Sequence, residues 1–133
     1  MTTYLIGTDG ESASTAICDH LESRLTADDR VRAVYATSSA DEEARQAVQL
    51  IEDRLGSIAP VDAGVVDFGR EGGPVMTLLA EADSTDADQM VVGLRRHSRT
   101  ERIIVGSVSH TLLEKVAIPI LLVPLPEYQT PAE

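Results

Sequence analysis

Short apolar runs alternate with amphipathic stretches along most of this chain. The apolar runs are typical of strands buried on both faces, and the stretches between them repeat apolar residues every three or four positions, as helices do. We expect strands at residues 4–8, 31–37, 61–68, 89–93 and 120–123. We expect helices that begin near residues 12, 41, 74 and 107.

Polar residues and glycines mark where the first two helices begin and end. Ser12 or Ser14 can cap the first helix, which should stop near residues 26–29. Asp41 opens the second helix, where acidic residues of the first turn complement the helix dipole, and Gly56 is a natural stop. These local signals agree with the apolar periodicity.

The alternation of strands and helices predicts one α/β domain. We expect a doubly wound parallel sheet with helices on both faces. A chain of 133 residues is long enough for one such core. We expect residues 125–133 to form a frayed tail. We place the domain at residues 1–126 and the C-terminal tail at residues 127–133.

The carboxyl ends of the first and fourth strands are the first candidates for a site. Ligands of doubly wound sheets bind outside such ends, where the strand order reverses. Asp9-Gly10 follows the first strand and Gly93 ends the fourth, so we expect them to be neighbours. The Asp9 carboxylate can accept hydrogen bonds from ribose hydroxyls or an adenine amino group. The alternative, an Asx-type turn with Gly10, is compatible with that role.

The segment after the fourth strand has the features of an anion site. Gly93 lets the backbone leave the sheet and approach a ligand without a Cβ in the way. Gly106 does the same where the fourth helix begins. Free N–H groups follow it on Ser107, Val108 and Ser109, and a helix N-terminus binds phosphate. The alternative is that Gly106 is a turn and Ser107 a plain N-cap.

The same segment is the basic patch of an acidic chain. Residues 95–102 hold four arginines and one glutamate, a net charge of +3, whereas the whole chain carries −11. The arginines are Arg95, Arg96, Arg99 and Arg102. A guanidinium can bind phosphate through two parallel hydrogen bonds. Alternatively, these side chains pair with carboxylates on the surface, which would add on the order of 0–1 kcal/mol each.

Composition narrows the classes of partner. The charge of −11 argues against nucleic acid or an anionic membrane as a partner. An acidic chain with one lysine suggests a salt-rich, halophilic cytoplasm, and the alternative is an ordinary acidic protein. We see neither a signal peptide nor a membrane span, and a single cysteine suits the reducing cytosol, so we expect a cytoplasmic protein.

Several catalytic motifs are absent from the sequence. It holds neither GxxxxGK[ST] nor GxSxG, which excludes a P-loop and a nucleophile elbow. The three histidines have no partner at metal-ligand spacing, so we predict no metal site. Cys18 falls within the first helix, and we expect it to be packed and unreactive.

Taken together, these residues resemble the universal stress protein (UspA-like) family over nearly the whole chain. Members carry Asp-Gly after the first strand, a G-x2-G-x9-G-[ST] loop after the fourth, and Pro-V/I-L-x-V in the last. The corresponding residues here are Asp9-Gly10, Gly93-x2-Arg96-x9-Gly106-Ser107 and Pro119-Ile120-Leu121-Leu122-Val123. The resemblance implies a sheet of order 3-2-1-4-5, as in adenine-nucleotide alpha-hydrolase-like domains. It also implies a homodimer that pairs through the last strand, residues 120–123.

The resemblance also implies a ligand, ATP or AMP, with or without Mg²⁺. Asp9 and Ala36 match the positions that hold adenosine in nucleotide-binding members. The residues that match positions holding ribose and phosphates are Gly93, Gly106, Ser107 and Ser109. Arg96 departs from the family, since it replaces the second glycine of the motif. Its side chain either blocks the approach of a phosphate or grips it with a guanidinium.

Three functions follow from these residues. The first is an adenine-nucleotide-binding stress protein that acts as a dimeric sensor or regulator. The second is a dimeric interaction module that has lost the nucleotide, with Arg96 as the mark of that loss. An enzyme is the third, but we identify no acid/base pair or nucleophile and assign no catalytic residue, so at most slow ATP hydrolysis is expected.

Overall fold

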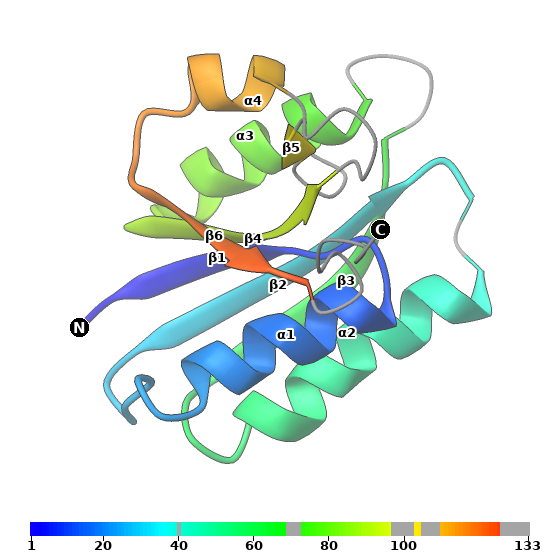
Figure 1. The fold of residues 1–133 in the computed structure, drawn as a ribbon. Coiled ribbons are helices and arrows are strands. Elements are labelled where there is room, and N and C mark those ends of the chain that lie inside the picture. The colour runs from blue at the N-terminus through cyan, green and yellow to red at the C-terminus, as the bar shows by residue number, and fades with distance from the viewer. Residues whose placement is uncertain (40, 69–72, 97–102, 105–109, 126–133) are drawn as a thin grey trace, which may run out of the picture.

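The computed structural model describes residues 1–39, 41–68, 73–96, 103–104 and 110–125. In these ranges five strands form one parallel sheet in the order β3-β2-β1-β4-β6 (Figure 1). Their bounds are Thr3–Gly7 for β1, Arg30–Thr37 for β2, Val61–Asp67 for β3, Gln89–Arg96 for β4 and Ile120–Pro124 for β6. A sixth strand, β5 (Ile103–Ile104), pairs antiparallel with the end of β4. The predicted five-stranded sheet is confirmed, and its fifth strand is β6.

Helices cover both faces of the sheet, which confirms the doubly wound arrangement. α1 (Glu11–Leu21) and α2 (Glu42–Leu55) lie on one face, and α3 (Gly73–Thr85) and α4 (His110–Lys115) lie on the other (Figure 1). Among the helices that the structure describes, none has the length and apolar character needed to cross a bilayer.

Each face of the sheet has its own apolar core because side chains alternate along the strands. In β1, Ile6 packs with Ile17 in the α1/α2 core, and Leu5 packs with Leu78 in the α3/α4 core. Ile6 and Leu5 are both fully buried, and each contributes roughly 1.5–3 kcal/mol to stability. Burial on both faces is the reason that the central strands read as continuous apolar runs.

The amino end of α1 differs from its prediction. Gly10 is the N-cap residue and no side chain caps the helix, so the assignment of Ser12 or Ser14 as the cap is wrong. Ser12 is exposed, whereas Ser14 is fully buried and its hydroxyl donates to the carbonyl of Ala47 at 2.8 Å. A tertiary contact therefore uses the serine that a local capping pattern would have used.

α1 also ends earlier than expected, at Leu21 instead of near residues 26–29. The Asp29 carboxylate accepts hydrogen bonds from the backbone N–H groups of Thr26 and Thr2, both at 2.9 Å. Side chains that bind nearby backbone groups compete with helical hydrogen bonds. The chain therefore turns after α1 and leads into β2.

α2 follows its prediction. Asp41 is the N-cap residue, and its carboxylate accepts the N–H of Ala44 at 3.0 Å. Gly56 ends the helix and donates its N–H to the carbonyl of Glu52 at 2.9 Å. A Cβ on Gly56 would lie 2.5 Å from that carbonyl oxygen, which explains why the stop residue is glycine.

The end of the described chain is more ordered than the sequence suggested. Leu125 is buried, and its N–H donates to the carbonyl of Leu94 at 3.2 Å. The expectation that the frayed tail begins at residue 125 is therefore wrong, and residues 126–133 lie outside the described residues. α4 is described from His110, so its predicted start near residue 107 also lies outside them.

Candidate functional site

The carboxyl end of β1 lies between those of β2 and β4, where the strand order reverses. Gly7, the last residue of β1, is paired with Val34 of β2 on one side and with Val92 of β4 on the other. The predicted closeness of these strand ends is confirmed. α1, the helix that follows β1, covers one face of the sheet, and α4, the first described helix after β4, lies on the other, as at a ligand site of this fold.

A three-residue turn carries Asp9 at this point. Thr8 begins the turn, and its N–H donates to the carbonyl of Val34 at 3.0 Å. Its Oγ1 atom lies 2.9 Å from the carbonyl oxygen of Gly10 and accepts the N–H of Gly10 at 3.4 Å. Asp9, which is half-buried, is therefore bracketed by contacts between its two neighbours.

The hydroxyl of Ser14 connects this turn to α2. Ser14 Oγ lies 2.8 Å from Thr8 Oγ1 and 2.8 Å from the carbonyl oxygen of Ala47 in α2. The Ser14 N–H also donates to the carbonyl of Gly10 at 3.0 Å. Sequence reasoning missed this network. The available signal was that Ser14 lies three residues before Ile17, on the apolar face of α1.

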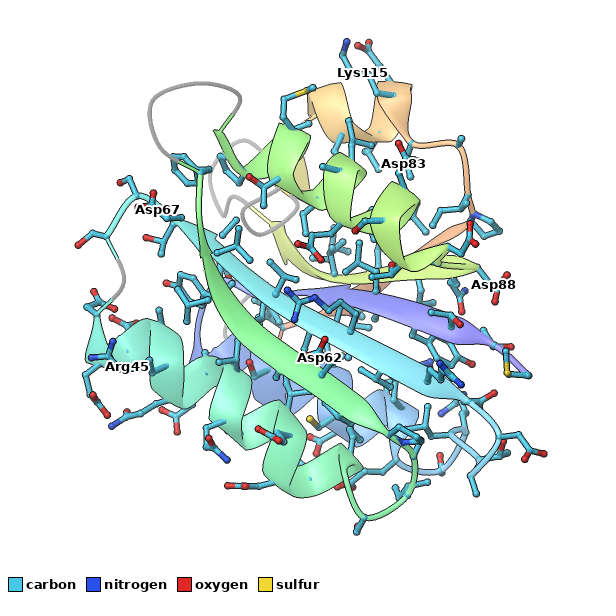
Figure 2. The ribbon with its side chains drawn as sticks, turned by 180° about the vertical axis from the view of Figure 1, so that it is seen from behind. Arg45, Asp62, Asp67, Asp83, Asp88 and Lys115 are labelled. Atoms are coloured by element: carbon cyan, nitrogen blue, oxygen red, sulfur yellow. The ribbon has the colours of Figure 1, made fainter. Side chains whose placement is uncertain are left out.

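Carboxylates surround the turn. Glu11 starts α1, Glu42 and Glu43 lie in the first turn of α2, and all three are exposed. Glu43 Oε2 lies 4.0 Å from the place that a Cβ on Gly10 would take. Asp67 ends β3 at the same end of the sheet (Figure 2). Negative charge repels phosphate, so this half of the site suits hydroxyl and amino groups.

Ala36 lies at the same end of the sheet as Asp9. It is two residues beyond Val34, whose carbonyl accepts the first hydrogen bond of the turn. Ala36 is half-buried, is paired with Val66 of β3, and packs against the α3/α4 core. The two residues predicted to hold adenosine are thus placed near each other, and their contact with a ligand stays a prediction.

Gly93 has a packing role that the sequence did not reveal. It is paired with Val123 inside β4, which continues to Arg96, so the expectation that the chain leaves the sheet at Gly93 is wrong. A Cβ here would lie 3.1 Å from Leu125 Cδ2 and 3.3 Å from Ala13 Cβ. The glycine is needed because Ala13 of α1 and Leu125 approach β4 closely. A ligand contact of Gly93 stays a prediction.

Arg96 closes β4 and is paired with Ile103 of β5. Strand backbone is open to every residue type except proline, which gives a physical reason why arginine is tolerated where the family motif has glycine. The other predicted phosphate contacts lie outside the described residues. They are Gly106, Ser107, Val108 and Ser109, together with Arg99 and Arg102 of the same segment.

Cys18 is packed, as predicted. It is fully buried in the α1/α2 core, and this burial raises the pKa of its thiol to about 11. A thiol with such a pKa is a poor nucleophile at neutral pH. Within the described ranges, no three His, Cys, Asp or Glu side chains gather as a metal site would require.

Comparison with known proteins gives one family. The sequence model of the universal stress protein family matches residues 1–124 of this chain. Stress response protein NhaX of Bacillus subtilis (strain 168) is 40% identical over 53 residues, which make up 40% of this chain. The matched segment spans 32% of the length of NhaX, about a third of that protein.

Solved structures share the fold at low identity. The universal stress protein from Archaeoglobus fulgidus is 19% identical with a TM-score of 0.65, and the match covers 92% of this chain and 98% of that one. The same protein has been solved in complex with dAMP. A universal stress protein solved in complex with cAMP is 22% identical with a TM-score of 0.62, and the match covers 93% of this chain and 97% of that one.

Proposed function

We propose an adenine nucleotide as the ligand of this chain, which belongs to the universal stress protein family. The observation that carries the proposal is the position of Asp9, on a short turn after β1 where the strand order reverses. A carboxylate there accepts hydrogen bonds from ribose hydroxyls or an adenine amino group. Proteins of this fold solved with cAMP and dAMP support the choice of an adenine nucleotide.

The proposed ligand spans two halves of opposite charge. Adenosine lies beside Asp9 and Ala36, where exposed carboxylates disfavour phosphate. The phosphates lie toward the end of β4 and the residues after it, since residues 95–102 carry a net charge of +3. In this scheme the ribose and phosphates are held by Gly93, Arg96, Gly106, Ser107, Val108 and Ser109. Mg²⁺ would accompany a triphosphate and needs no site among the described residues.

The proposed role is that of a dimeric sensor or regulator in a stress response, with β6 as the dimer contact. In the described part of the chain, β6 has a strand neighbour on one side only, β4. Its residues Ile120, Leu121 and Leu122 are half-buried. An apolar edge strand left open invites pairing with another chain. Analytical ultracentrifugation tests this contact, and a protein that stays monomeric at high concentration contradicts it.

Arg96 favours a second candidate function. Because it replaces the glycine of the family motif, its side chain can obstruct the phosphates, and the chain would then act as a dimeric interaction module without a nucleotide. Both candidates are binding functions, and neither assigns a catalytic residue.

Calorimetric titration with ATP, ADP and AMP at low and high salt tests the first function. Saturable binding is expected, and Asp9→Asn should weaken it about tenfold or more, since hydrogen bonds to a charged group contribute about 1.5–3 kcal/mol. Asp83→Asn is the matched control, because Asp83 is exposed near the end of α3, at the opposite end of the sheet (Figure 2).

Two outcomes contradict the proposal. The first is no binding at millimolar nucleotide, and the second is equal affinity of the Asp9→Asn and Asp83→Asn variants. If the nucleotide binds, Arg96→Gly decides the role of the arginine. Tighter binding means that Arg96 obstructs the phosphates, and weaker binding means that it grips them.

A further inference from the structure

We propose that the buried hydroxyl pair of Thr8 and Ser14 is a positioning device, which holds the turn that carries Asp9 and ties that turn to α2. The inference rests on the proposed function, since it gives the ligand contact to Asp9. Thr8 begins the turn, Ser14 connects it to α2, and both act on the ligand only through the position of Asp9.

Buried hydroxyls lower the stability of the fold unless they form hydrogen bonds. Ser14 is 0% exposed and Thr8 is 2% exposed, among apolar residues of the α1/α2 core. A buried hydroxyl without a hydrogen bond costs roughly 1–3 kcal/mol, whereas alanine or valine would carry no such cost. Every buried side-chain oxygen or nitrogen of the described residues has a partner, these two hydroxyls included. Their contacts reach the turn, each other and α2.

Both hydroxyls are needed to connect the turn to α2 by hydrogen bonds. Two hydroxyl protons serve three contacts, to the carbonyl of Gly10, between the hydroxyls, and to the carbonyl of Ala47. In one arrangement Ser14 donates to Ala47 and Thr8 donates to Ser14. In the other, Thr8 donates to Gly10 and Ser14 donates to Thr8. Only the first arrangement joins the turn to α2 through a continuous chain of hydrogen bonds, because in the second the single Ser14 proton goes to Thr8 and not to Ala47.

Contacts of Thr8 and Ser14 hold the backbone of Gly10. Helix N-termini are commonly fixed by a capping side chain, but Gly10 is the N-cap residue of α1 and provides none. The position of Gly10 relative to α1 depends on the Ser14 N–H, and its position relative to β1 depends on Thr8 Oγ1. Loss of the hydroxyl pair should therefore loosen the turn without unfolding the strand or helix beside it.

The pair also places α2 in contact with the site. Ala47 accepts the Ser14 hydroxyl, and Glu43, one turn earlier in α2, lies close to Gly10. Ala47 of α2 is thus connected through Ser14 to the segment that carries Asp9.

Isosteric variants separate positioning from stability. Thr8→Val removes the hydroxyl and keeps the shape, Thr8→Ser keeps the hydroxyl, and Ser14→Ala removes the second member of the pair. Thr85→Val is the matched control, because the Thr85 hydroxyl bonds a carbonyl inside α3, at the opposite end of the sheet. The measurements are amide hydrogen exchange at Gly10 in the ligand-free protein, and calorimetric affinity for AMP.

Thr8→Val and Ser14→Ala should each speed exchange at Gly10 and weaken AMP binding by roughly five- to tenfold, as expected for one hydrogen bond. Thr8→Ser and Thr85→Val should stay within about twofold of the parent protein, and the Thr8→Val, Ser14→Ala double variant should lose less than the product of the single losses.

Several results overturn the inference. One is unchanged exchange at Gly10 in both hydroxyl deletions, and another is a Thr8→Ser variant that behaves like Thr8→Val. Faster exchange with unchanged AMP affinity would show that the pair does not position Asp9 for a ligand. If the parent protein binds none of ATP, ADP and AMP, the proposed function fails, and exchange at Gly10 then decides by itself whether the pair holds the turn.

Discussion

The two faces of the sheet are alike in how their helices approach it. On the α3 face, Gly7 leaves room for Leu78, whose Cδ2 would lie 3.0 Å from a Cβ on Gly7. On the α1 face, Gly93 leaves room for Ala13 and Leu125, which would lie 3.3 and 3.1 Å from a Cβ on Gly93. Each of the two central strands therefore lacks a side chain where a neighbouring element comes closest.

The faces differ in their polar contacts. Arg54 joins α2 to α1 through Asp19 at 2.7 Å and Glu22 at 2.8 Å, on an accessible surface. Arg32 joins β2 to α3 through Glu81 at 2.9 Å, and these two side chains are only 18% and 20% exposed. The helices beside the Asp9 turn are thus held to each other, whereas α3 is held to the sheet. The ion pairs of Arg54 therefore hold α1 and α2 together as one layer beside the candidate site.

The largest expected effect comes from filling the two glycine positions. Gly93→Ala and Gly7→Ala should each lower the free energy of unfolding by about 1–3 kcal/mol, because the new methyl group overpacks the core. The loss should be larger at Gly93, since Ala13 has no rotamer that moves it away, whereas Leu78 can rotate. Urea unfolding followed by circular dichroism measures both losses.

Gly10→Ala is the control for the two packed glycines. A Cβ there would meet no heavy atom nearer than Glu43 Oε2 at 4.0 Å, and the backbone is extended, so the loss should be the smallest of the three. A loss at Gly10 as large as that at Gly93 would show that packing is the wrong explanation.

A smaller effect is expected from the ion pairs, and it should differ between the faces. Arg32→Gln should cost about 1–2 kcal/mol, because it leaves Glu81 without its charged partner in a half-buried place. Arg54→Gln should cost less than about 1 kcal/mol, because its partners are accessible to water and salt. Unfolding at low and high salt measures both. Equal losses, or a stronger salt effect for Arg32, would contradict the comparison.

The smallest effect is confined to acidic pH. Hydrogen bonds from the N–H groups of Thr26 and Thr2 lower the pKa of Asp29. A carboxyl whose pKa is lower in the folded state stabilises the protein above its unfolded pKa, roughly 4, and loses this contribution as the pH falls through the folded pKa. Asp29→Asn should therefore flatten the pH dependence of stability below about pH 4 and leave its slope near pH 7 unchanged.

Thermal unfolding between pH 2 and pH 7 measures this effect. Asp28→Asn is the neighbouring control, since Asp28 is exposed. If Asp29→Asn and Asp28→Asn have the same pH profile, the hydrogen bonds of Asp29 do not explain the acid sensitivity.

Local signals predicted the second helix better than the first. At α2, Asp41 and Gly56 act through backbone groups within four residues of themselves, so a short window of sequence contains the whole interaction. At α1, Ser14 bonds Ala47, which is 33 residues away, and Thr2 bonds Asp29, which is 27 residues away. A capping pattern cannot include such partners, so both ends of α1 were misplaced.

In the candidate site, too, local features could be predicted from the sequence and long-range contacts could not. Asp9 could be located because it follows an apolar run, and parallel strands bring their carboxyl ends together. Ala36 was assigned only through the resemblance to the family. The packing role of Gly93 could not be predicted, because Ala13 and Leu125 reach it from opposite ends of the chain.

The order of strands and helices, the parallel sheet and the family could all be predicted from the residues alone. These follow from periodicity and from motifs whose residues act locally. The burial of Leu125, the packing at Gly93 and the contact between the Thr8 and Ser14 hydroxyls became evident only in the folded chain. Each of these depends on atoms that are distant in the chain, and their close approach arises only when the two helical layers pack on the sheet.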